Sequence, residues 1–204
     1  LEALRARFDE RAIAVAADVA GDAGNDMVAD AVVAAWGGVD VWIANAGVSP
    51  IVAGPLDTPT DVWRRVLDVN LTGAFLGARA AARAMGDGGR ILVTGSVLGE
   101  RPRKGLAAYS ASKAGVVGMV KALALDLADR GITVNAVNPG WFDSPLTEPW
   151  QDSDRLTRSV LDHTALERWG RSEDLAGAYL FLASPAADFV TGTVITVDGG
   201  YSCV

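Results

Sequence analysis

The chain of 204 residues has the length of one domain, and half of its residues are hydrophobic, as in ordinary globular proteins. Its 25 acidic and 18 basic residues give a net charge of −7, which disfavours nucleic acid and anionic membrane as partners. One cysteine, Cys203, and one histidine, His163, exclude an internal disulfide and a metal cluster of the usual spacing. We therefore expect a cytoplasmic protein with no metal and no membrane span.

Short apolar runs alternate with longer segments of helical periodicity. We predict strands, in chain order, at 12–16, 39–44, 90–93, 133–137 and 194–197. We predict helices at 23–36, 59–85, 108–129 and 172–183, and an irregular loop with short helices at 140–169. This alternation predicts a single α/β domain over 1–204, with a doubly wound parallel sheet covered on both faces.

Small and polar residues follow each predicted strand. They are Asp18-Val19, Asn45-Ala46-Gly47, Thr94-Gly95-Ser96, Asn138-Pro139-Gly140 and Asp198-Gly199-Gly200. Each group alone is equally well explained as a tight turn. Ligands of an open parallel sheet bind beyond the carboxyl ends of its strands, so the recurrence of these groups favours a binding site there.

Tyr109 and Lys113 are four residues apart in a predicted helix, so their side chains share one face. A free tyrosine has a pKa of about 10, and a neighbouring ammonium lowers that pKa because it favours the phenolate. The pair could therefore exchange a proton with a substrate. A pair of this kind also arises by chance, so it indicates a catalytic site without establishing one.

A set of motifs in this order resembles the classical short-chain dehydrogenase/reductase family and covers the whole chain. The motifs are Asp18-Val19, Asn45-Ala46-Gly47, Val69-Asn70-Leu71-Thr72-Gly73, Gly95-Ser96, Tyr109-Ser110-Ala111-Ser112-Lys113, Asn138-Pro139-Gly140 and Val197-Asp198-Gly199-Gly200. Ser96 also precedes Tyr109 by the separation that the family uses. The resemblance implies a Rossmann-like fold and hydride transfer between NAD or NADP and a small-molecule alcohol or ketone.

The resemblance also implies catalytic roles. Tyr109 would be the general acid/base, with Lys113 lowering its pKa and binding the nicotinamide ribose. Ser96 would hold the carbonyl oxygen as charge develops on it. Asn70 would bind a water that links Lys113 to solvent, although a backbone contact that bends the helix explains this residue equally well.

The implied cofactor contacts lie at several strand ends. Asp18 would accept a hydrogen bond from the adenine amino group, and Val19 would pack near the ring. The backbone of Asn45, Ala46 and Gly47 would follow the adenosine ribose. At the nicotinamide end the implied contacts are Pro139, Gly140 and Ser144, with Tyr109 and Lys113. The sequence gives no preference between NAD and NADP.

The front of the chain departs from the family pattern. Relatives begin with a strand, a glycine-rich turn and a helix that binds pyrophosphate, whereas residues 1–8 look like the helix after the second strand. By this comparison a βαβ unit of about 30 or more residues is absent, which would leave a gap of roughly 14 Å between the predicted strands at 12–16 and 39–44. We expect the native polypeptide to be longer. The alternative is a degenerate, non-catalytic relative that serves as a scaffold or regulatory subunit.

The substrate pocket is expected in the loop 140–169 and near Ser96. The candidate walls are Val97, Leu98, Trp141, Phe142 and Trp150, although large aromatic residues are also common in cores. The segment from Asn138 to Pro145 resembles relatives that act on gluconate or sugar alcohols, which favours a sugar, polyol or hydroxy acid. A 3-oxoacyl-carrier-protein reductase is the alternative.

Two further expectations concern the surface. The basic stretch Arg101-Pro102-Arg103-Lys104 is interpreted as a solvated loop, with contact to an acidic substrate as the alternative. The resemblance implies a homotetramer, in which the helices at 59–85 and 108–129 form one interface and the C-terminal strand and tail form another.

Overall fold

The fold is described from a computed structural model, which describes residue 8 and residues 11–204. Four strands form one parallel sheet in the order β1-β2-β3-β4. Their bounds are β1 Val41–Ala44, β2 Gly89–Thr94, β3 Ile132–Pro139 and β4 Val194–Val197. The predicted α/β class with a parallel sheet is confirmed, and four of the five predicted strands are present with small shifts at their ends. The helix expected at 1–8 lies outside the described residues, except for residue 8.

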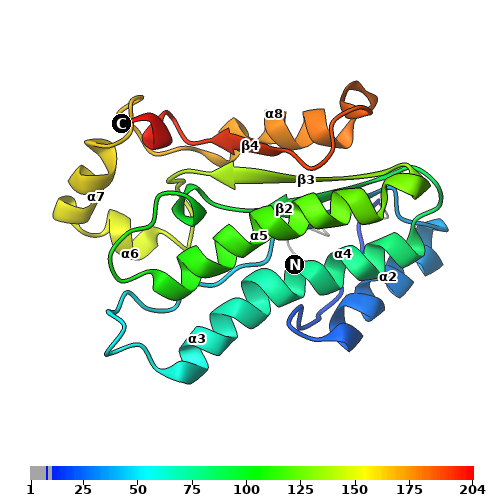
Figure 1. The fold of residues 1–204 in the computed structure, drawn as a ribbon, viewed down its shortest axis with the longest axis horizontal. Coiled ribbons are helices and arrows are strands. Elements are labelled where there is room, and N and C mark those ends of the chain that lie inside the picture. The colour runs from blue at the N-terminus through cyan, green and yellow to red at the C-terminus, as the bar shows by residue number, and fades with distance from the viewer. Residues whose placement is uncertain (1–7, 9–10) are drawn as a thin grey trace.

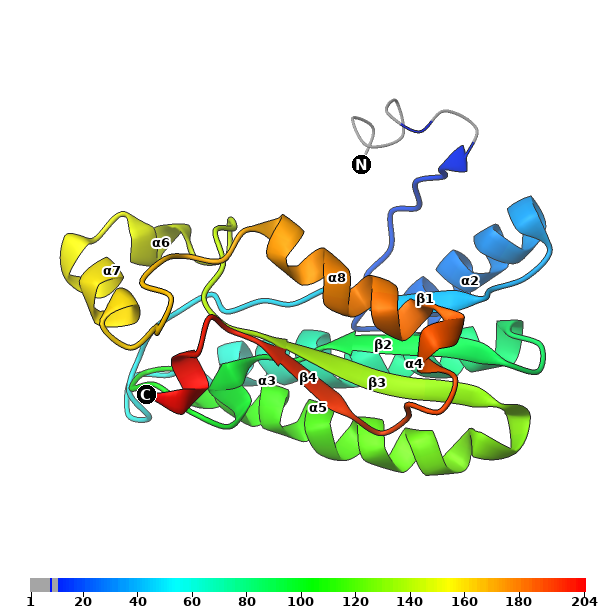
Figure 2. The same ribbon diagram turned by 90° about the horizontal axis from the view of Figure 1, so that it is seen from above.

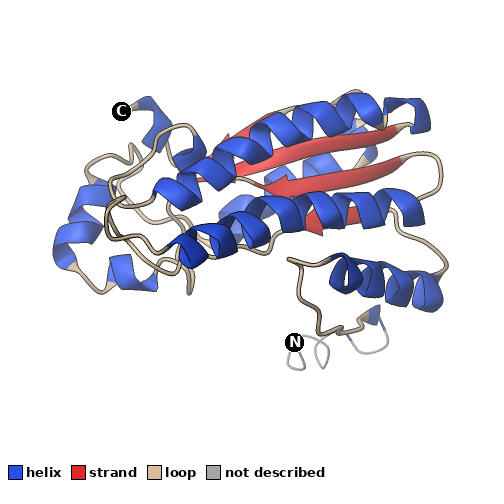
Figure 3. Cartoon of the chain, turned by 60° about the horizontal axis from the view of Figure 1, so that its bottom comes forward, coloured by secondary structure: helices blue, strands red, loops and turns tan. Residues whose placement is uncertain are grey.

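Helices cover both faces of this sheet. They are α2 (Asp22–Trp36), α3 (Thr60–Leu67), α4 (Gly73–Ala84), α5 (Ala107–Asp126), α6 (Glu148–Gln151), α7 (Asp154–Leu161) and α8 (Ser172–Ala183). On one face α4 packs against β1 and β2, α5 packs against β3, and α2 packs against α4 (Figure 1). On the opposite face α8 contacts β2, β3 and β4, as Figure 2 shows from above. Figure 3 shows the helices of the first layer in front of the strands.

The core forms where the small residues of α4 and the branched residues of α5 meet the middle strands. Ala78 and Ala81 of α4 are buried against the sheet with Ile91 of β2, while Val116 and Val120 of α5 are fully buried nearby. Burial of one such valine stabilises the fold by about 1.5–3 kcal/mol. This core therefore packs along β2 and β3, the two middle strands of the sheet.

The strand predicted at 12–16 is wrong, because residues 12–18 form no strand. A strand needs a neighbour for its backbone groups, and within the described residues the sheet ends at β1. Val41 and Ile43 of β1 are accordingly 39% and 47% exposed. The segment after residue 16 is held instead by α2, whose Asn25 side-chain amide donates a hydrogen bond to the Val19 carbonyl at 2.8 Å.

The helix predicted at 59–85 is interrupted. A π-helical turn at Asp68–Thr72 separates α3 from α4, and α3 packs against α5. Such turns often occur at functional sites. This turn carries Asn70, whose side chain bonds to a neighbouring loop rather than to its own helix.

The loop predicted at 140–169 contains the short helices α6 and α7, as expected. It lies at the carboxyl ends of the strands, together with the loops that lead into α3 and α5 (Figure 1). Short 3₁₀ turns complete the structure at Val97–Gly99, Ala128–Arg130, Pro185–Ala187 and Tyr201–Cys203. Among the described helices, none is both long and apolar enough to cross a membrane.

Candidate active site

A cleft of about 700 Å³ opens at the carboxyl ends of the first three strands. Most of the residues predicted for a site line this one cleft. They are Asn45, Ala46 and Gly47 after β1, Ser96 and Leu98 after β2, Tyr109 and Lys113 on α5, and Pro139, Gly140, Trp141, Phe142, Ser144 and Trp150 at and after the end of β3. The strand-end pattern in the sequence therefore corresponds to one concave surface.

Two glycines let the strand ends approach one another at this surface. A Cβ atom on Gly95 would lie 1.9 Å from Asn138 Oδ1, and one on Gly140 would lie 2.7 Å from the Cα atom of Asp198. These distances are shorter than any real contact, so a larger residue at position 95 would displace the buried Asn138 side chain, and one at position 140 would push the ends of β3 and β4 apart. Glycine is required here for close approach rather than for an unusual backbone angle.

Ser96 is held by the turn that follows it. Its Oγ accepts a hydrogen bond from the Leu98 backbone N–H at 3.1 Å and so caps the 3₁₀ turn at Val97–Gly99. That turn packs on α5, because a Cβ on Gly99 would lie 2.8 Å from the backbone nitrogen of Ala114. The Ser96 hydroxyl is thereby placed against α5, where it hydrogen-bonds with Tyr109.

Burial controls the pKa of Tyr109. Desolvation raises the pKa of the phenol above its usual value of 10, and the hydrogen bond with Ser96 lowers it in part. Lys113 Nζ lies 5.7 Å from the centroid of the tyrosine ring. The expectation that Lys113 sets a lowered pKa is therefore not met in this structure, because desolvation outweighs the opposing influences. Tyr109 is a protonated phenol at neutral pH.

Lys113 is a buried ammonium group inside the cleft. Its Nζ donates to the Thr94 carbonyl at 2.7 Å, which ties α5 to the end of β2. Burial lowers the pKa of this lysine from 10.5 to about 8. At neutral pH the group thus stays mainly charged, although the fold holds it at an energetic cost.

This cost makes the stability of the protein depend on pH. Between about pH 8 and pH 10 the unfolded chain, with a lysine pKa of 10.5, binds more protons at this position than the folded chain does. Stability rises with pH wherever the unfolded state binds more protons. We expect the free energy of unfolding to gain up to about 3 kcal/mol from this group across that window. Tyr109, whose folded pKa is raised, opposes the gain only toward the upper end of that window, where the unfolded phenol begins to lose its proton, and this contribution is common to both proteins compared below.

Urea unfolding of the wild type and of Lys113→Met at about pH 7.5 and about pH 9.5 checks this expectation. The wild type should become more stable relative to the variant at the higher pH. An equal response of both proteins to pH would contradict the burial of a charged Lys113.

Asn70 lies behind the cleft and connects it to the π-helical turn. Its Oδ1 accepts from the Val48 N–H at 2.8 Å, and its Nδ2 donates to the Val48 carbonyl at 3.0 Å and to Ser112 Oγ at 3.1 Å. Ser112 in turn donates to the Tyr109 carbonyl at 2.6 Å. The Asn70 side chain thus contacts backbone, but the backbone of the Val48 loop and not that of its own helix, which the alternative interpretation expected. The same contacts hold Asn70 beside the tyrosine segment.

Besides Asn70, three predicted residues do not line the cleft. Asp18 is 65% exposed, accepts from the Ala20 N–H at 3.0 Å and lies 3.5 Å from Arg65. That backbone N–H, aided by Arg65 and opposed by slight desolvation, lowers the pKa of Asp18. Val19 is fixed by Asn25. Val97, predicted as a pocket wall, is 2% exposed, because its side chain packs into an apolar cluster with Leu106.

An aromatic cluster supports the cleft from the loop side. Trp141 is buried, and its ring centroid lies 4.8 Å from that of Trp150, 5.9 Å from Trp169 and 6.3 Å from Tyr201. Both sequence interpretations of these aromatics therefore apply, because Trp141 and Trp150 line the cleft and also form its supporting core.

Sequence reasoning assigned no role to several lining residues. These are Ser49, Thr94, Leu106, Asp143, Pro145, Leu146, Thr147, Ser172 and Leu175. Thr94 belongs to the strand-end group Thr94-Gly95-Ser96 noted in the sequence, although no role of its own was predicted for it, and it ends β2 two residues before Ser96. Ser172 and Leu175 come from α8 on the other face of the sheet, and no local pattern predicts that this helix reaches the cleft.

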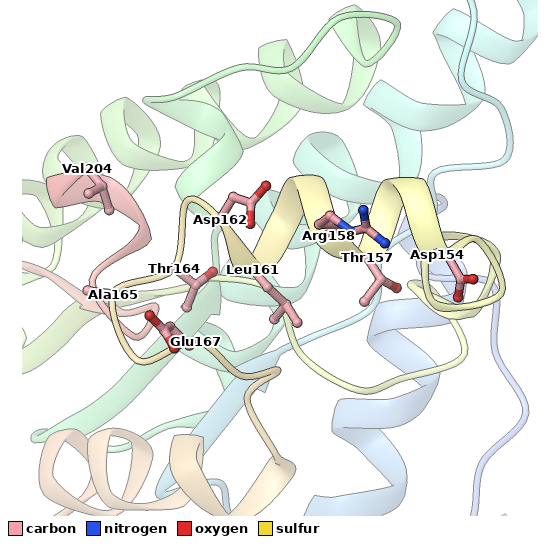
Figure 4. Close-up of a pocket in the computed structure, with 9 residues that line it drawn as sticks. All are labelled: Asp154, Thr157, Arg158, Leu161, Asp162, Thr164, Ala165, Glu167 and Val204. Carbon is pink, nitrogen blue, oxygen red and sulfur yellow. The ribbon is translucent and has the colours of Figure 1, made fainter.

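A larger groove of about 880 Å³ runs along the outer side of α7. Figure 4 shows its lining, which includes Asp154, Arg158, Asp162 and Glu167. The groove lies away from Ser96, Tyr109 and Lys113, which line the other cavity. Convergent titratable groups, rather than size, mark a site of chemistry, so the cleft at the strand ends is the candidate active site.

Comparisons with known proteins agree with this arrangement. A family model described as enoyl-(acyl carrier protein) reductase matches residues 1–202. The chain is 43% identical over 194 residues to 3beta-hydroxysteroid dehydrogenase 1 of Eggerthella lenta, covering 93% of this chain and 73% of that protein. It is 39% identical over 192 residues to a 3-oxoacyl-(acyl-carrier-protein) reductase of Synechocystis sp., covering 93% and 75% respectively.

A solved structure shows the same fold. A gluconate 5-dehydrogenase from Burkholderia cenocepacia, in complex with NADP and tartrate, is 35% identical to this chain and superposes with a TM-score of 0.91. The match covers 99% of this chain and 81% of that one. The chain described here thus spans roughly three quarters to four fifths of the length of these three proteins.

Proposed function

Because this chain belongs to the short-chain dehydrogenase/reductase family of NAD(P)-dependent oxidoreductases acting on CH–OH groups, we propose that Tyr109 is the general acid/base of a hydride transfer between a nicotinamide coenzyme and a secondary alcohol or ketone. One observation carries the proposal. Ser96, Tyr109 and Lys113 come from two different elements, and all three line one cleft at the ends of the parallel strands.

The residues of the cleft fit a nicotinamide ribose. Small residues form the wall that follows β1, and a Cβ on Gly47 would lie 3.7 Å from Lys113 Nζ, so the backbone there leaves space beside the ammonium. Lys113 has hydrogens besides the one donated to Thr94 and would bind the ribose hydroxyls. Pro139, Gly140 and Ser144 would border the nicotinamide from the β3 side. When bound, the coenzyme supplies or accepts the hydride.

The chain's own residues handle the proton. In the direction of reduction, the neutral Tyr109 hydroxyl gives its proton to the substrate oxygen as that oxygen gains electron density. Ser96 hydrogen-bonds the same oxygen from the capped turn, which requires little reorganisation. Ser96, which lies 13 residues before Tyr109, thus stabilises the charge that develops on the substrate oxygen, and the proton from Tyr109 neutralises that charge.

Asn70 would complete a proton path from Lys113 to solvent. A Cβ on Gly47 would lie 3.6 Å from Asn70 Oδ1 and 3.7 Å from Lys113 Nζ, so the two polar groups border the same small space. Asn70 Oδ1 has a second lone pair besides the one used by the Val48 N–H. A water in this space could bridge the two groups. Asp18 and Val19 would contact the adenine from outside the cleft described here.

We propose a sugar, polyol or hydroxy acid as the substrate. The resemblance of residues 138–145 to gluconate and sugar-alcohol relatives supports this, as does the similarity to a gluconate 5-dehydrogenase. A 3-oxoacyl-carrier-protein reductase is the second candidate, favoured by the 39% identity to such an enzyme. The walls Leu98, Phe142 and Trp150 would decide between them.

The proposed working form is a homotetramer in a reducing cytoplasm. Phe75 of α4 and Leu125 of α5 are 39% and 79% exposed on the helical layer, where a second subunit could cover them. The free, exposed Cys203 supports a reducing compartment.

Titration with NADH and NADPH, followed by fluorescence, tests the proposed function. We expect saturable binding of at least one coenzyme with a dissociation constant of about 1 μM to 1 mM, the range in which enzymes bind their substrates. The coenzyme that binds more tightly would then be used with a panel of sugars, polyols, hydroxy acids and ketones. Binding of neither would favour the non-catalytic scaffold or regulatory subunit.

A further inference from the structure

A second depression of about 450 Å³ adjoins the active-site cleft. Trp150 lines both cavities, so one indole side chain forms part of the wall between them. The charged residues that line the depression are Arg103, Lys104 and Arg155, all cations. In a chain with a net charge of −7, this is a local concentration of positive charge beside the site of chemistry.

Among the residues that the structure describes, none of these three cations has an ion-pair partner. Within the described residues, the ion pairs of the structure involve other cations, namely Arg65, Arg79, Arg83, Arg90 and Arg168. Arg103 Nη2 donates to Ser159, whereas its Nη1 is buried and has no hydrogen-bond partner. A buried charged donor without an acceptor is costly, so the site is one that an anion would complete.

Arg103 is also held in place. Its guanidinium carbon lies 5.4 Å from the ring centroid of Trp141 and 5.3 Å from that of Trp150. Contact with two indole faces fixes the planar group and reduces the entropy lost when it binds a ligand. The stretch that the sequence indicates as a solvated loop thus has one residue packed against two tryptophans that line the active-site cleft.

The short helix α7 separates charge between its two sides. Arg155 and Ser159 face the depression, while Asp154, Arg158 and Asp162 line the outer groove shown in Figure 4. Asp154 of this helix and Asp162 at its C-terminal end therefore line a different cavity from Arg103 and Lys104. The charged side chains that line the depression are therefore all positive.

We propose that the depression bounded by Arg103, Lys104 and Arg155 binds the anionic end, a carboxylate or a phosphate, of a substrate whose reacting carbon lies at Tyr109. The inference rests on the proposed function and refines its substrate class. The anionic group and the reacting carbon would lie on either side of Trp150. Arg103 would form the directional hydrogen bond, and Lys104 and Arg155 would add attraction at the exposed rim.

The first test measures anion binding without catalysis. Sodium phosphate and sodium succinate are titrated separately at constant ionic strength, and tryptophan fluorescence is recorded, since Trp150 borders the depression. The proteins are the wild type, Arg155→Gln and Arg158→Gln. Both arginines are exposed on α7, so the second variant removes the same charge from the same helix on the other side. Arg103 is left intact because it packs against two tryptophans.

We expect saturable binding by the wild type and by Arg158→Gln, and about fivefold weaker binding by Arg155→Gln. A response to phosphate alone assigns a phosphate group, and a response to succinate alone assigns a carboxylate. The proposal is overturned if neither anion binds, or if Arg155→Gln and Arg158→Gln behave alike.

A kinetic comparison separates this inference from the proposed function. The KM for 4-oxopentanoate is compared with the KM for 2-pentanone, a neutral ketone of the same chain length. Arg155→Gln should raise the first KM about fivefold, with unchanged kcat, and leave the second KM unchanged. If the wild type turns over both ketones with equal KM values, the oxidoreductase function is supported and the proposed anion site is wrong.

Discussion

Tyr109→Phe is expected to lower turnover by about 10²–10⁴-fold while leaving coenzyme affinity nearly unchanged. The substitution removes the hydroxyl that gives the proton to the substrate, and this loss has the size of a general acid's contribution. The aromatic ring stays, so the wall of the cleft keeps its shape. Steady-state kinetics and a fluorescence titration with the preferred coenzyme would measure the two quantities separately.

Tyr179→Phe is a matched control for this experiment. The Tyr179 hydroxyl is also partly buried and bonds to Thr94 Oγ1 at 2.6 Å, but Tyr179 lies outside the set of residues that line the cleft. Its loss should change turnover by only a few-fold. Wild-type activity in Tyr109→Phe would show that another group moves the proton.

Lys113→Met is expected to impair both turnover and coenzyme affinity, each by at least about tenfold. The variant removes a buried cation that lines the cleft, and it also removes the hydrogen bond to the Thr94 carbonyl at 2.7 Å. Methionine fills a similar volume, so the packing of α5 should persist. The two losses are measured by the same kinetics and titration as for Tyr109.

The control for this substitution is Lys121→Met, which removes an exposed lysine from the same helix. It should leave turnover and coenzyme affinity unchanged, since it alters only surface charge. If Lys113→Met binds coenzyme as tightly as the wild type, the role of Lys113 at the ribose is wrong, although its role beside Tyr109 could remain.

The sequence was sufficient to predict the sheet and the centre of the site because both depend on short-range patterns. β2 and β3 are apolar runs that end in small residues, and parallel strands bring such ends together. Tyr109 and Lys113 are linked by helical spacing alone. The position of Ser96 near them came from the family resemblance, and the structure adds the physical cause, which is the capped turn packed on α5.

The errors arise where distant parts of the chain decide the outcome. The segment 12–16 has the composition of a strand but no neighbouring strand within the described residues. Val97 follows Ser96 directly, and yet its side chain turns into the core that Val160 and Tyr201 complete from far along the chain. The direction of the Tyr109 pKa shift was also wrong, because spacing shows the neighbouring charge and not the extent of burial.

The π-helical turn at Asp68–Thr72 acts as a phase adjustment in what is otherwise one long helix. Each residue of an α-helix advances the side-chain direction by about 100°, so an extra residue in the turn rotates the apolar stripe of one half relative to the other. α3 can thereby face α5, while α4 faces α2 and the edge of the sheet at β1. Deleting one residue from this turn would rotate α3 relative to α4 by about 100°, so that only one of the two helices could keep its packing partners. The length of the segment is thus fixed by packing at both of its ends.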